Sequence, residues 1–244
     1  MVARLLCRGH PRSWPLTPRR TPAGIFSLCS RPVAPTRTPI PVVDRVLPRG
    51  FYSRPTLQVA RDLIGKTLVH VTSSGRTSGL IVEVEAYIGE GDPACHAASG
   101  LTGRNAPLYG RPGRAYVYLN YGIHHLVNAV TEPEGVPAAV LLRAAEPVEG
   151  VNLMRRRRQT TGLRARQSSL PEKELCRGPG KLTRAFGISA AHNRLDLCGT
   201  RLFVEDGGVG GEPKVEWTPR VGIRVGTAAR WRCAVVVSAC VSGR

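Results

Sequence analysis

The chain has 244 residues, of which 42% are hydrophobic, and this is enough for one sizeable core. Its 35 Lys and Arg residues outnumber the 17 Asp and Glu residues and give a formal net charge of +18, which favours a polyanionic partner such as DNA, RNA or an anionic lipid surface. The apolar runs at 138–142 and 234–237 are too short to span a bilayer, so we expect a soluble protein. The seven scattered cysteines include no Cys-x-x-Cys pair, so we expect neither a disulfide framework nor a zinc knuckle, as is usual in a reducing compartment.

Residues 1–48 differ in composition from the rest of the chain. They hold nine of the 20 prolines, and the first 50 residues contain nine Arg and a single acid, Asp44. We expect a disordered leader, because such a proline-rich segment has no periodic apolar face. Its Arg-rich, acid-poor character resembles a mitochondrial transit peptide, but the prolines would interrupt an amphipathic helix, and an extended or misassigned start explains it equally well. The first 50 residues account for +8 of the net charge, so residues 51–244 keep +10.

A short helix and a β-hairpin are the first elements predicted in the ordered part. The helix spans 56–64, where apolar residues recur on one face after Pro55, and Gly65 can end it. Strands at 67–71 and 77–87 follow, separated by a Ser-Ser-Gly-Arg turn.

The second of these strands carries the most informative pattern of the chain. Read with period 2, one face carries the apolar residues at 80, 82, 84 and 86 and belongs in a core, while the other carries Ile81, Glu83, Glu85 and Tyr87. Glu85 and Tyr87 place an acid or base beside a flat ring. Such a pair could activate a water against a planar substrate, and the basic chain around it suggests a nucleobase.

A long loop and a second hairpin come next. The loop, rich in Gly, Pro, Asp and Asn, runs from 89 to 113 and carries His96 and Arg104. Long ordered loops in compact domains are usually functional. The turn Asn120-Tyr121-Gly122 then interrupts an alternating pattern, so we expect Tyr121 at the tip of a protruding hairpin.

The remaining elements alternate irregularly between strand and helix. The further predicted strands are 115–119, 123–130, 138–142, 201–205, 221–225 and 234–238, and the further predicted helices are 148–158 and 178–186. The third of these strands delivers Arg143 at its end. The first helix ends in four arginines, of which Arg155 and Arg156 are candidate phosphate contacts, with a solvated basic helix end as the equal alternative. We predict a single α+β domain over residues 49–244, with a mostly antiparallel sheet and surrounding helices.

Several separate runs carry a resemblance to a known family. They are Ile81–Tyr87 (IVEVEAY) with Asp92, Pro93, Ala94 and His96; Gly103-Arg104-Asn105; Tyr116–Gly122 (YVYLNYG) with Asn128; Val140–Pro147 (VLLRAAEP); and Gly178–Leu182 (GPGKL) with Asp196 and Leu197. In this order they closely resemble the alkyladenine (3-methyladenine) DNA glycosylase family of animals and many bacteria. The resemblance covers roughly residues 47–232, most of the ordered chain, and several ordered motifs are far more specific than a lone glycine pattern.

The resemblance implies a role for each matching residue. Glu85 matches the general base that deprotonates a water aimed at C1′ of the deoxyribose, and Arg143 matches a residue that holds this water. Tyr87 and His96 match one wall of the pocket for a flipped purine, and Tyr118 matches the opposite wall.

Contacts with the edge of the base and with the duplex are implied in the same way. Asn128 matches the residue that meets the purine edge and helps to exclude guanine through its exocyclic amine. Tyr121 matches the wedge inserted through the minor groove into the space that the flipped nucleotide leaves. The candidate contacts with the DNA backbone are Arg104, Lys181, Arg155 and Arg156.

The implied function is that of a monofunctional DNA glycosylase of base excision repair. It would flip alkylated purines such as 3-methyladenine and 7-methylguanine out of duplex DNA, hydrolyse the N-glycosidic bond and leave an abasic site. A cationic purine is already a good leaving group, so no metal or cofactor is required, and no lysine stands out as an amine nucleophile. We expect a monomer that acts on double-stranded DNA with alkylated or deaminated purines. Excision of hypoxanthine and ethenoadenine stays open. The expected location is the cytoplasm or nucleoid in a bacterium, and the nucleus, with the mitochondrion as a further compartment, in a eukaryote.

Residues 232–244 depart from the family pattern. After Trp231 and Arg232, members usually continue with aromatic residues and a Gly-Asn turn before a final Val-Ser, whereas this chain has the run 233–240 (CAVVVSAC) before Val241 and Ser242. We expect a looser last strand and a looser side of the pocket. This would affect substrate range and stability more than the type of reaction.

Two other functions stay open. A non-catalytic basic module, in which Glu85 is structural, predicts tight, salt-sensitive binding to nucleic acid without base release. A metal-dependent nuclease would use Glu83 and Glu85 as ligands and predicts Mg²⁺-dependent strand scission, although the sequence offers no further clustered Asp to complete such a site. Each candidate residue also has a structural explanation when taken alone, and it is their joint spacing that favours the glycosylase.

Overall fold

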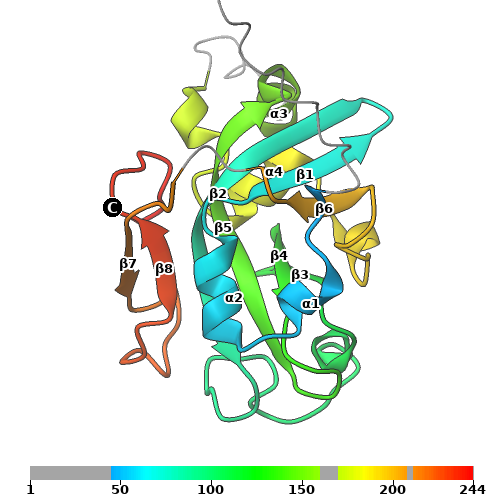
Figure 1. The fold of residues 1–244 in the computed structure, drawn as a ribbon, viewed down its shortest axis with the longest axis vertical. Coiled ribbons are helices and arrows are strands. Elements are labelled where there is room, and N and C mark those ends of the chain that lie inside the picture. The colour runs from blue at the N-terminus through cyan, green and yellow to red at the C-terminus, as the bar shows by residue number, and fades with distance from the viewer. Residues whose placement is uncertain (1–44, 160–169, 208–210, 244) are drawn as a thin grey trace, which may run out of the picture. The chain divides into compact units, whose positions relative to one another are not determined.

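The computed structural model describes residues 45–159, 170–207 and 211–243. They form a curved antiparallel sheet with helices packed against it, as Figure 1 shows. The predicted α+β class is therefore confirmed. Most of the predicted leader, residues 1–44, lies outside the described residues.

One sheet organises the fold. In the described part of the chain it contains eight strands: β1 (Thr67–Thr72), β2 (Gly75–Ile88), β3 (Ala115–Asn120), β4 (His124–Val130), β5 (Ala138–Glu149), β6 (Leu202–Glu205), β7 (Val215–Thr218) and β8 (Arg232–Val235). Every pairing between them is antiparallel, in the order β3-β4-β5-β2-β1-β6. The last strand, β8, pairs with both β2 and β7. The long strands β2 and β5 therefore form the centre of the sheet.

Helices cover the sheet. The α-helices of the described residues are α1 (Arg49–Tyr52), α2 (Thr56–Leu63), α3 (Val151–Arg158) and α4 (Pro179–Phe186), with short 3₁₀ turns at Ala106–Tyr109, Glu172–Glu174 and Ala190–His192. Helix α2 packs against β2 and β5, α4 against β4 and β5, and α3 against α4. Both α2 and α4 end where the sequence predicts, because Gly65 and Gly187 follow them with φ values of 83° and 73°, the left-handed region that favours glycine.

The main core lies between the sheet, α2 and α4. Its largest fully buried side chains include Tyr52, Leu63, Leu142, Leu182 and Phe186. Burying one such side chain contributes about 1.5–3 kcal/mol. The core therefore fixes β2 and β5, and with them the charged residues that these two strands carry.

A β-bulge interrupts the predicted alternation along β2. The pairing of β2 with β5 shifts between Ile81 and Glu83 and again between Glu83 and Val84. As a result Ile81 packs in the main core beside Val84, while Val82 packs in a second small cluster with Val241. The predicted common face of residues 80, 82, 84 and 86 is thus wrong in its first half, because the bulge re-aims these side chains and both faces of β2 are covered.

Three other predictions need correction. Strand β5 continues to Glu149, so Arg143 lies within the strand instead of at its end. The predicted strand ends before Arg143 because a charged residue rarely lies within a buried strand. In the structure the charge of Arg143 is paired with two glutamates of β2. Residues 221–225 form a loop instead of a strand, and β7, which was not predicted, pairs with β8.

The chain contacts the sheet before residue 49. Val46 forms a bridge with Glu205 of β6, and the Leu47 N–H donates to the Val204 carbonyl at 2.8 Å. Residues 45–48, predicted as part of the leader, therefore already lie against the edge strand.

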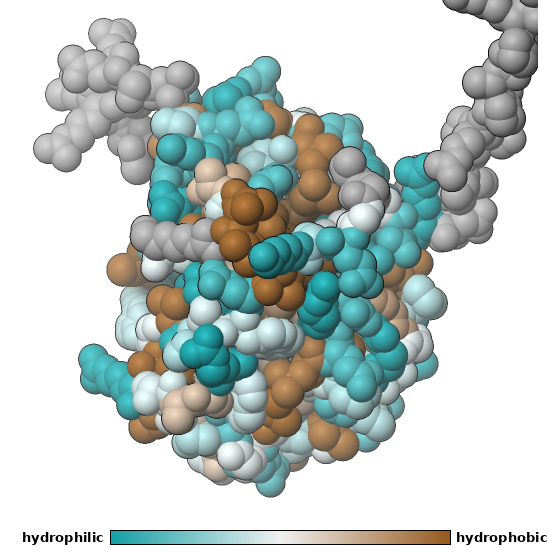
Figure 2. Space-filling view, turned by 60° about the vertical axis from the view of Figure 1, so that its left-hand side comes forward, coloured by the Kyte–Doolittle hydropathy of each residue, from teal (hydrophilic) through white to brown (hydrophobic). Residues whose placement is uncertain are grey.

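No α-helix in the described ranges has the length and apolar character that a transmembrane helix requires. On the face that includes β7 and β8, apolar side chains gather in groups between polar ones (Figure 2).

Candidate active site

A cavity of about 340 Å³ opens where the β3–β4 hairpin, the loop after β2 and the loop before β8 meet. Pockets for small molecules start at about this size. Six of the predicted site residues line it: Tyr87, His96, Tyr118, Tyr121, Asn128 and Arg143. A larger hollow of about 640 Å³ lies between α2 and β8, but it contains none of the predicted site residues. The smaller cavity is therefore the candidate active site.

Glu85 lies behind the wall of this cavity and is fully buried. Its Oε2 accepts a hydrogen bond from the Tyr87 hydroxyl at 3.0 Å and lies 3.2 Å from Arg143 Nη1. Its Oε1 accepts a hydrogen bond from the Val221 N–H at 2.7 Å. Burial and the adjacent Glu85 raise the pKa of Tyr87, so this hydroxyl stays protonated and keeps donating. The carboxylate is thus held by three donors, two of which belong to cavity-lining side chains.

Arg143 joins the two glutamates of β2. Its Nε donates to Glu83 Oε1 at 2.8 Å, and its Nη1 approaches Glu85. Glu83 also accepts from Arg232 Nε at 2.7 Å and from the Ser242 N–H at 2.7 Å. Burial alone raises the pKa of Glu83, but Arg143, the Ser242 N–H and Arg232 outweigh it, so the pKa lies below its ordinary value. Glu83 is therefore an ionised support for Arg143.

The side wall of the cavity is a cluster of aromatic rings. His96 Nδ1 lies 2.8 Å from the Tyr116 hydroxyl, and the Tyr116 and Tyr118 rings are 5.2 Å apart. Burial, aided by the nearby Arg104, lowers the pKa of His96, so the imidazole is neutral near pH 7. The ring centroids of His96 and Tyr118 lie 4.4 Å apart at an angle of 64°. These two rings, predicted on opposite walls, therefore touch one another in this structure.

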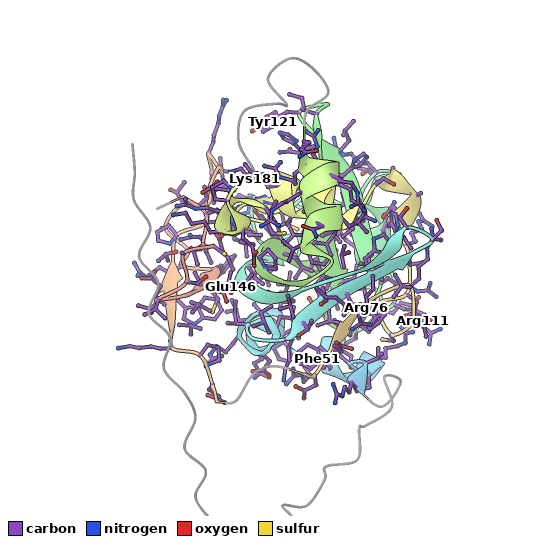
Figure 3. The ribbon with its side chains drawn as sticks, turned by 90° about the horizontal axis from the view of Figure 1, so that it is seen from above. Phe51, Arg76, Arg111, Tyr121, Glu146 and Lys181 are labelled. Carbon is purple, nitrogen blue, oxygen red and sulfur yellow. The ribbon has the colours of Figure 1, made fainter. Side chains whose placement is uncertain are left out.

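Asn128 and Tyr121 occupy different depths of the same site. Asn128, on β4, is buried and donates through Nδ2 to the Tyr116 carbonyl at 3.0 Å. Tyr121 lies in the turn between β3 and β4 and is 81% exposed, with a φ of 49°. Figure 3 shows its side chain at the outer edge of the molecule, on the same side as Lys181. The predicted exposed tip is confirmed as a structural feature.

The predicted backbone contacts differ in their surroundings. Arg104 is exposed, lies 5.8 Å from the Tyr118 ring centre and donates to the Leu119 carbonyl. Lys181 lies on α4 and pairs with Glu174 at 2.7 Å. The first residue of α4, Pro179, lines the cavity. Two of the four arginines of α3 are further candidates: Arg155 pairs with Glu172 at 3.4 Å, and Arg156 is exposed.

Sequence reasoning missed a buried ion pair beneath the aromatic wall. Arg220 donates to both carboxylate oxygens of Asp92, at 2.5 and 2.7 Å, and both side chains are fully buried. The guanidinium also lies 4.7 Å from the Tyr87 ring centre and 4.9 Å from that of Trp231. The pair ties the loop after β2 to the loop before β8 and supports Tyr87 from behind. Asp92 belongs to a run that carries the resemblance, but Arg220 had no signal in the sequence.

The geometry does not favour a cation between the carboxylates. Glu83 accepts from two arginines, and Glu85 is bonded to Tyr87, Val221 and Arg143. Across the ranges that the structure describes, no group of three or more His, Cys, Asp or Glu side chains is arranged to hold a metal ion. The arrangement suits a buried carboxylate beside an arginine and a pocket for a flat ring.

Comparison with known proteins finds a matching family and similar sequences. The family model described as methylpurine-DNA glycosylase matches residues 50–238. The similar proteins named "Putative 3-methyladenine DNA glycosylase" include those of three organisms. The protein of Methanocella arvoryzae is 49% identical over 82% of this chain and 96% of its own, that of Chlorobium phaeobacteroides is 47% identical over 81% and 96%, and that of Burkholderia orbicola is 40% identical over 85% and 96%. The similarity thus includes every strand and helix that lines the cavity.

Proposed function

This chain belongs to the methylpurine-DNA glycosylase family, hydrolases that act on N-glycosyl bonds in DNA repair, and we propose that it excises alkylated purines such as 3-methyladenine and 7-methylguanine from duplex DNA. The observation that carries this proposal is the buried Glu85 carboxylate, held beside Arg143 directly behind an aromatic cavity. A carboxylate in this position can accept a proton from a water that attacks C1′ of the flipped nucleotide.

The cavity suits a flat, cationic base. Aromatic rings stack on a cationic purine with favourable electrostatics, and a neutral His96 adds no opposing charge. A base that stacks between His96 and Tyr118 requires these touching rings to separate. Asn128, buried at the side of the cavity, is the group we assign to the purine edge.

The exposed Tyr121 is the side chain that we assign to the flipping of the base. A side chain at a hairpin tip can enter the minor groove and fill the space of an extruded nucleotide, which offsets part of the cost of unstacking. The basic character of residues 51–244 provides attraction to phosphates. We propose that one chain acts as a monomer on one lesion.

The product is an abasic site with an intact backbone. Among the described residues no lysine lines the cavity, so a water, rather than a lysine amine, is the nucleophile that this arrangement favours. Arg143, 3.2 Å from Glu85, can orient that water and stabilise the charge of the carboxylate.

Replacing Glu85 by Gln tests the assignment of the base. The amide keeps the shape of the side chain but cannot take the proton, so we expect release of methylated purine to fall at least about a hundredfold, as for loss of a general base. Binding to lesion-containing duplex should stay close to that of the unmodified protein. The measurement is chromatography of bases released from methylated DNA in the presence of a chelator, with binding followed by fluorescence anisotropy.

Glu149→Gln is the matched control, because Glu149 is an exposed glutamate of β5 that pairs with Arg76 away from the cavity. Base release unchanged by Glu85→Gln would remove Glu85 as the base. Strand scission that needs Mg²⁺ would support the nuclease instead, and salt-sensitive binding without any base release would support the non-catalytic module.

A further inference from the structure

The C-terminal segment that contains Val241 and Ser242 reaches back to the charged groups of the active site. Val241 packs against Val82 and Ala144 in a small apolar cluster, and its carbonyl accepts a hydrogen bond from Arg177 Nε at 3.0 Å. These contacts bring the buried Ser242 beside Glu83. The last described residues are therefore part of the surroundings of the site.

Ser242 completes the set of partners around Arg143. The three nitrogens of the Arg143 guanidinium each contact a different side chain: Nε donates to Glu83 at 2.8 Å, Nη1 lies 3.2 Å from Glu85, and Nη2 donates to Ser242 Oγ at 3.0 Å. The Ser242 hydroxyl in turn donates to Glu83 Oε1 at 2.9 Å. A planar guanidinium with three fixed partners has one orientation, and in this orientation Nη1 faces Glu85.

The main chain of Ser242 has separate anchors. Its N–H donates to Glu83 Oε2 at 2.7 Å, and its carbonyl accepts from Arg232 Nη2 at 2.7 Å. Removing only the hydroxyl therefore leaves the segment attached. It does leave Arg143 Nη2 as a buried donor without an acceptor, which is unfavourable. Rotating toward Glu83, which has two carboxylate oxygens, would restore a partner for Nη2 but turn Nη1 away from Glu85.

We propose that Ser242 is a positioning residue for base release, which holds the Arg143 guanidinium against Glu85 through its hydroxyl. This inference rests on the proposed function, since the group positioned is the one that orients the attacking water. Ser242 does not contact the substrate itself. Its effect should appear in the rate of the chemical step and not in the affinity for the lesion.

Ser242→Ala, Ser242→Thr and Ser242→Cys in the full chain test the proposal. We expect the single-turnover rate of base release at saturating enzyme to fall roughly ten- to a hundredfold in Ser242→Ala, as for a slightly misplaced catalytic group. The dissociation constant for lesion-containing duplex should change less than about twofold, well below one factor of ten. Ser242→Thr, which keeps the hydroxyl, should restore most of the rate. Ser242→Cys, similar in volume but a weak acceptor, should behave like Ser242→Ala even if the alanine variant folds poorly.

Ser238→Ala is the matched control. Ser238 lies in the same segment and also donates to a carboxylate, Glu146 Oε1 at 2.6 Å, but it has no contact with Arg143. A wild-type rate in Ser242→Ala, or equal losses in Ser242→Ala and Ser238→Ala at matched thermal stability, would overturn the positioning role. Absence of base release in the unmodified protein would instead reject the proposed function, so the two failures are distinguishable.

Discussion

Tyr121 combines an exposed aromatic ring with a backbone conformation that favours glycine. Its φ of 49° lies in the left-handed region, where an L-residue costs about 1 kcal/mol or more, and the ring gains little burial in return at 81% exposure. Within the described residues, no burial of the ring offsets the cost of a tyrosine at this tip. Contact with a duplex would provide the missing burial.

Tyr121→Gly separates these two effects. Glycine relieves the strained φ, so the thermal unfolding midpoint should stay at or above that of the unmodified protein. Release of methylated purine from duplex DNA should fall at least about tenfold, because unstacking costs a few kcal/mol that the wedge no longer offsets. Release from single-stranded DNA should change little.

Ile123→Ala is the control on the same hairpin, since Ile123 is 72% exposed. The measurements are differential scanning fluorimetry and single-turnover release from both forms of DNA. Equal losses on duplex and single-stranded DNA would contradict a wedge.

At the scale of elements, the bulge in β2 and a histidine contact between β1 and the 3₁₀ turn at 190–192 are decisive. The register shifts lie around Glu83, where Arg143 of β5 contacts both Glu83 and Glu85. In the histidine contact, His70 Nδ1 lies 2.8 Å from the Phe186 carbonyl at the end of α4, and His192 Nε2 lies 3.1 Å from His70 Nε2. A carbonyl accepts only, so His70 carries its proton on Nδ1 and accepts on Nε2. Protonation of His70 at Nε2 would remove the acceptor of this contact, so His70 has to be neutral. His192 Nδ1 accepts a hydrogen bond from the Ser189 N–H at 3.1 Å, which likewise requires a neutral ring.

This contact predicts a loss of stability in mild acid. Burial lowers the pKa of both His70 and His192 below the ordinary value of 6.5, and the charge of Arg201 lowers both further. Arg157 also lowers the pKa of His70, and His125 that of His192. The unfolded chain therefore binds more protons once the pH falls below about 6.5, and the free energy of unfolding decreases from there, while above that pH these groups have no effect. We expect a decrease of about 1 kcal/mol or more between about pH 7.5 and 5.5.

Urea titrations at the two pH values measure this change. His192→Gln should flatten the dependence, and the remaining slope includes His96, whose pKa is also lowered. The exposed His124 offers the control substitution His124→Gln, which should keep the wild-type slope. A slope unchanged by His192→Gln would show that the histidine contact is not its source.

At the scale of the whole molecule, positive charge and the Tyr121 tip define a candidate DNA-binding side. Figure 3 shows Tyr121 and Lys181 on one side of the molecule, and Arg111 well apart from them. Arg104 belongs to the Tyr121 side, because it lies over Tyr118 of the same hairpin. Lys181 is already paired with Glu174, so Arg104 is the better probe of a phosphate contact.

Affinity for undamaged duplex should fall linearly with salt on logarithmic axes, and Arg104→Gln should reduce the slope by about one, as for loss of one phosphate contact. Arg111 is also exposed, and Arg111→Gln should leave the slope unchanged. Fluorescence anisotropy over a series of salt concentrations measures both. A larger change in slope for Arg111→Gln than for Arg104→Gln would place the DNA on another side of the molecule.

The sequence by itself determined the parts of the protein that depend on neighbours in the chain. Turn residues and period-2 patterns identified the two hairpins and the exposed Tyr121, and glycine after an apolar stripe identified the ends of α2 and α4. The pairing of Glu85 with Tyr87 also follows from spacing alone, since the two lie two residues apart on one strand.

Only the tertiary structure decided which distant groups meet. Arg220 lies 128 residues from Asp92, and Ser242 lies 159 residues from Glu83, so no local pattern predicts either contact. A strand buried on both faces, such as β2, loses the alternation that reveals its orientation, and a bulge shifts it further. Buried charges become favourable only when their partners arrive from elsewhere in the chain. Glu85 and Arg143 are therefore candidate residues from the motifs around them, while the buried partners that hold them appear only in the fold.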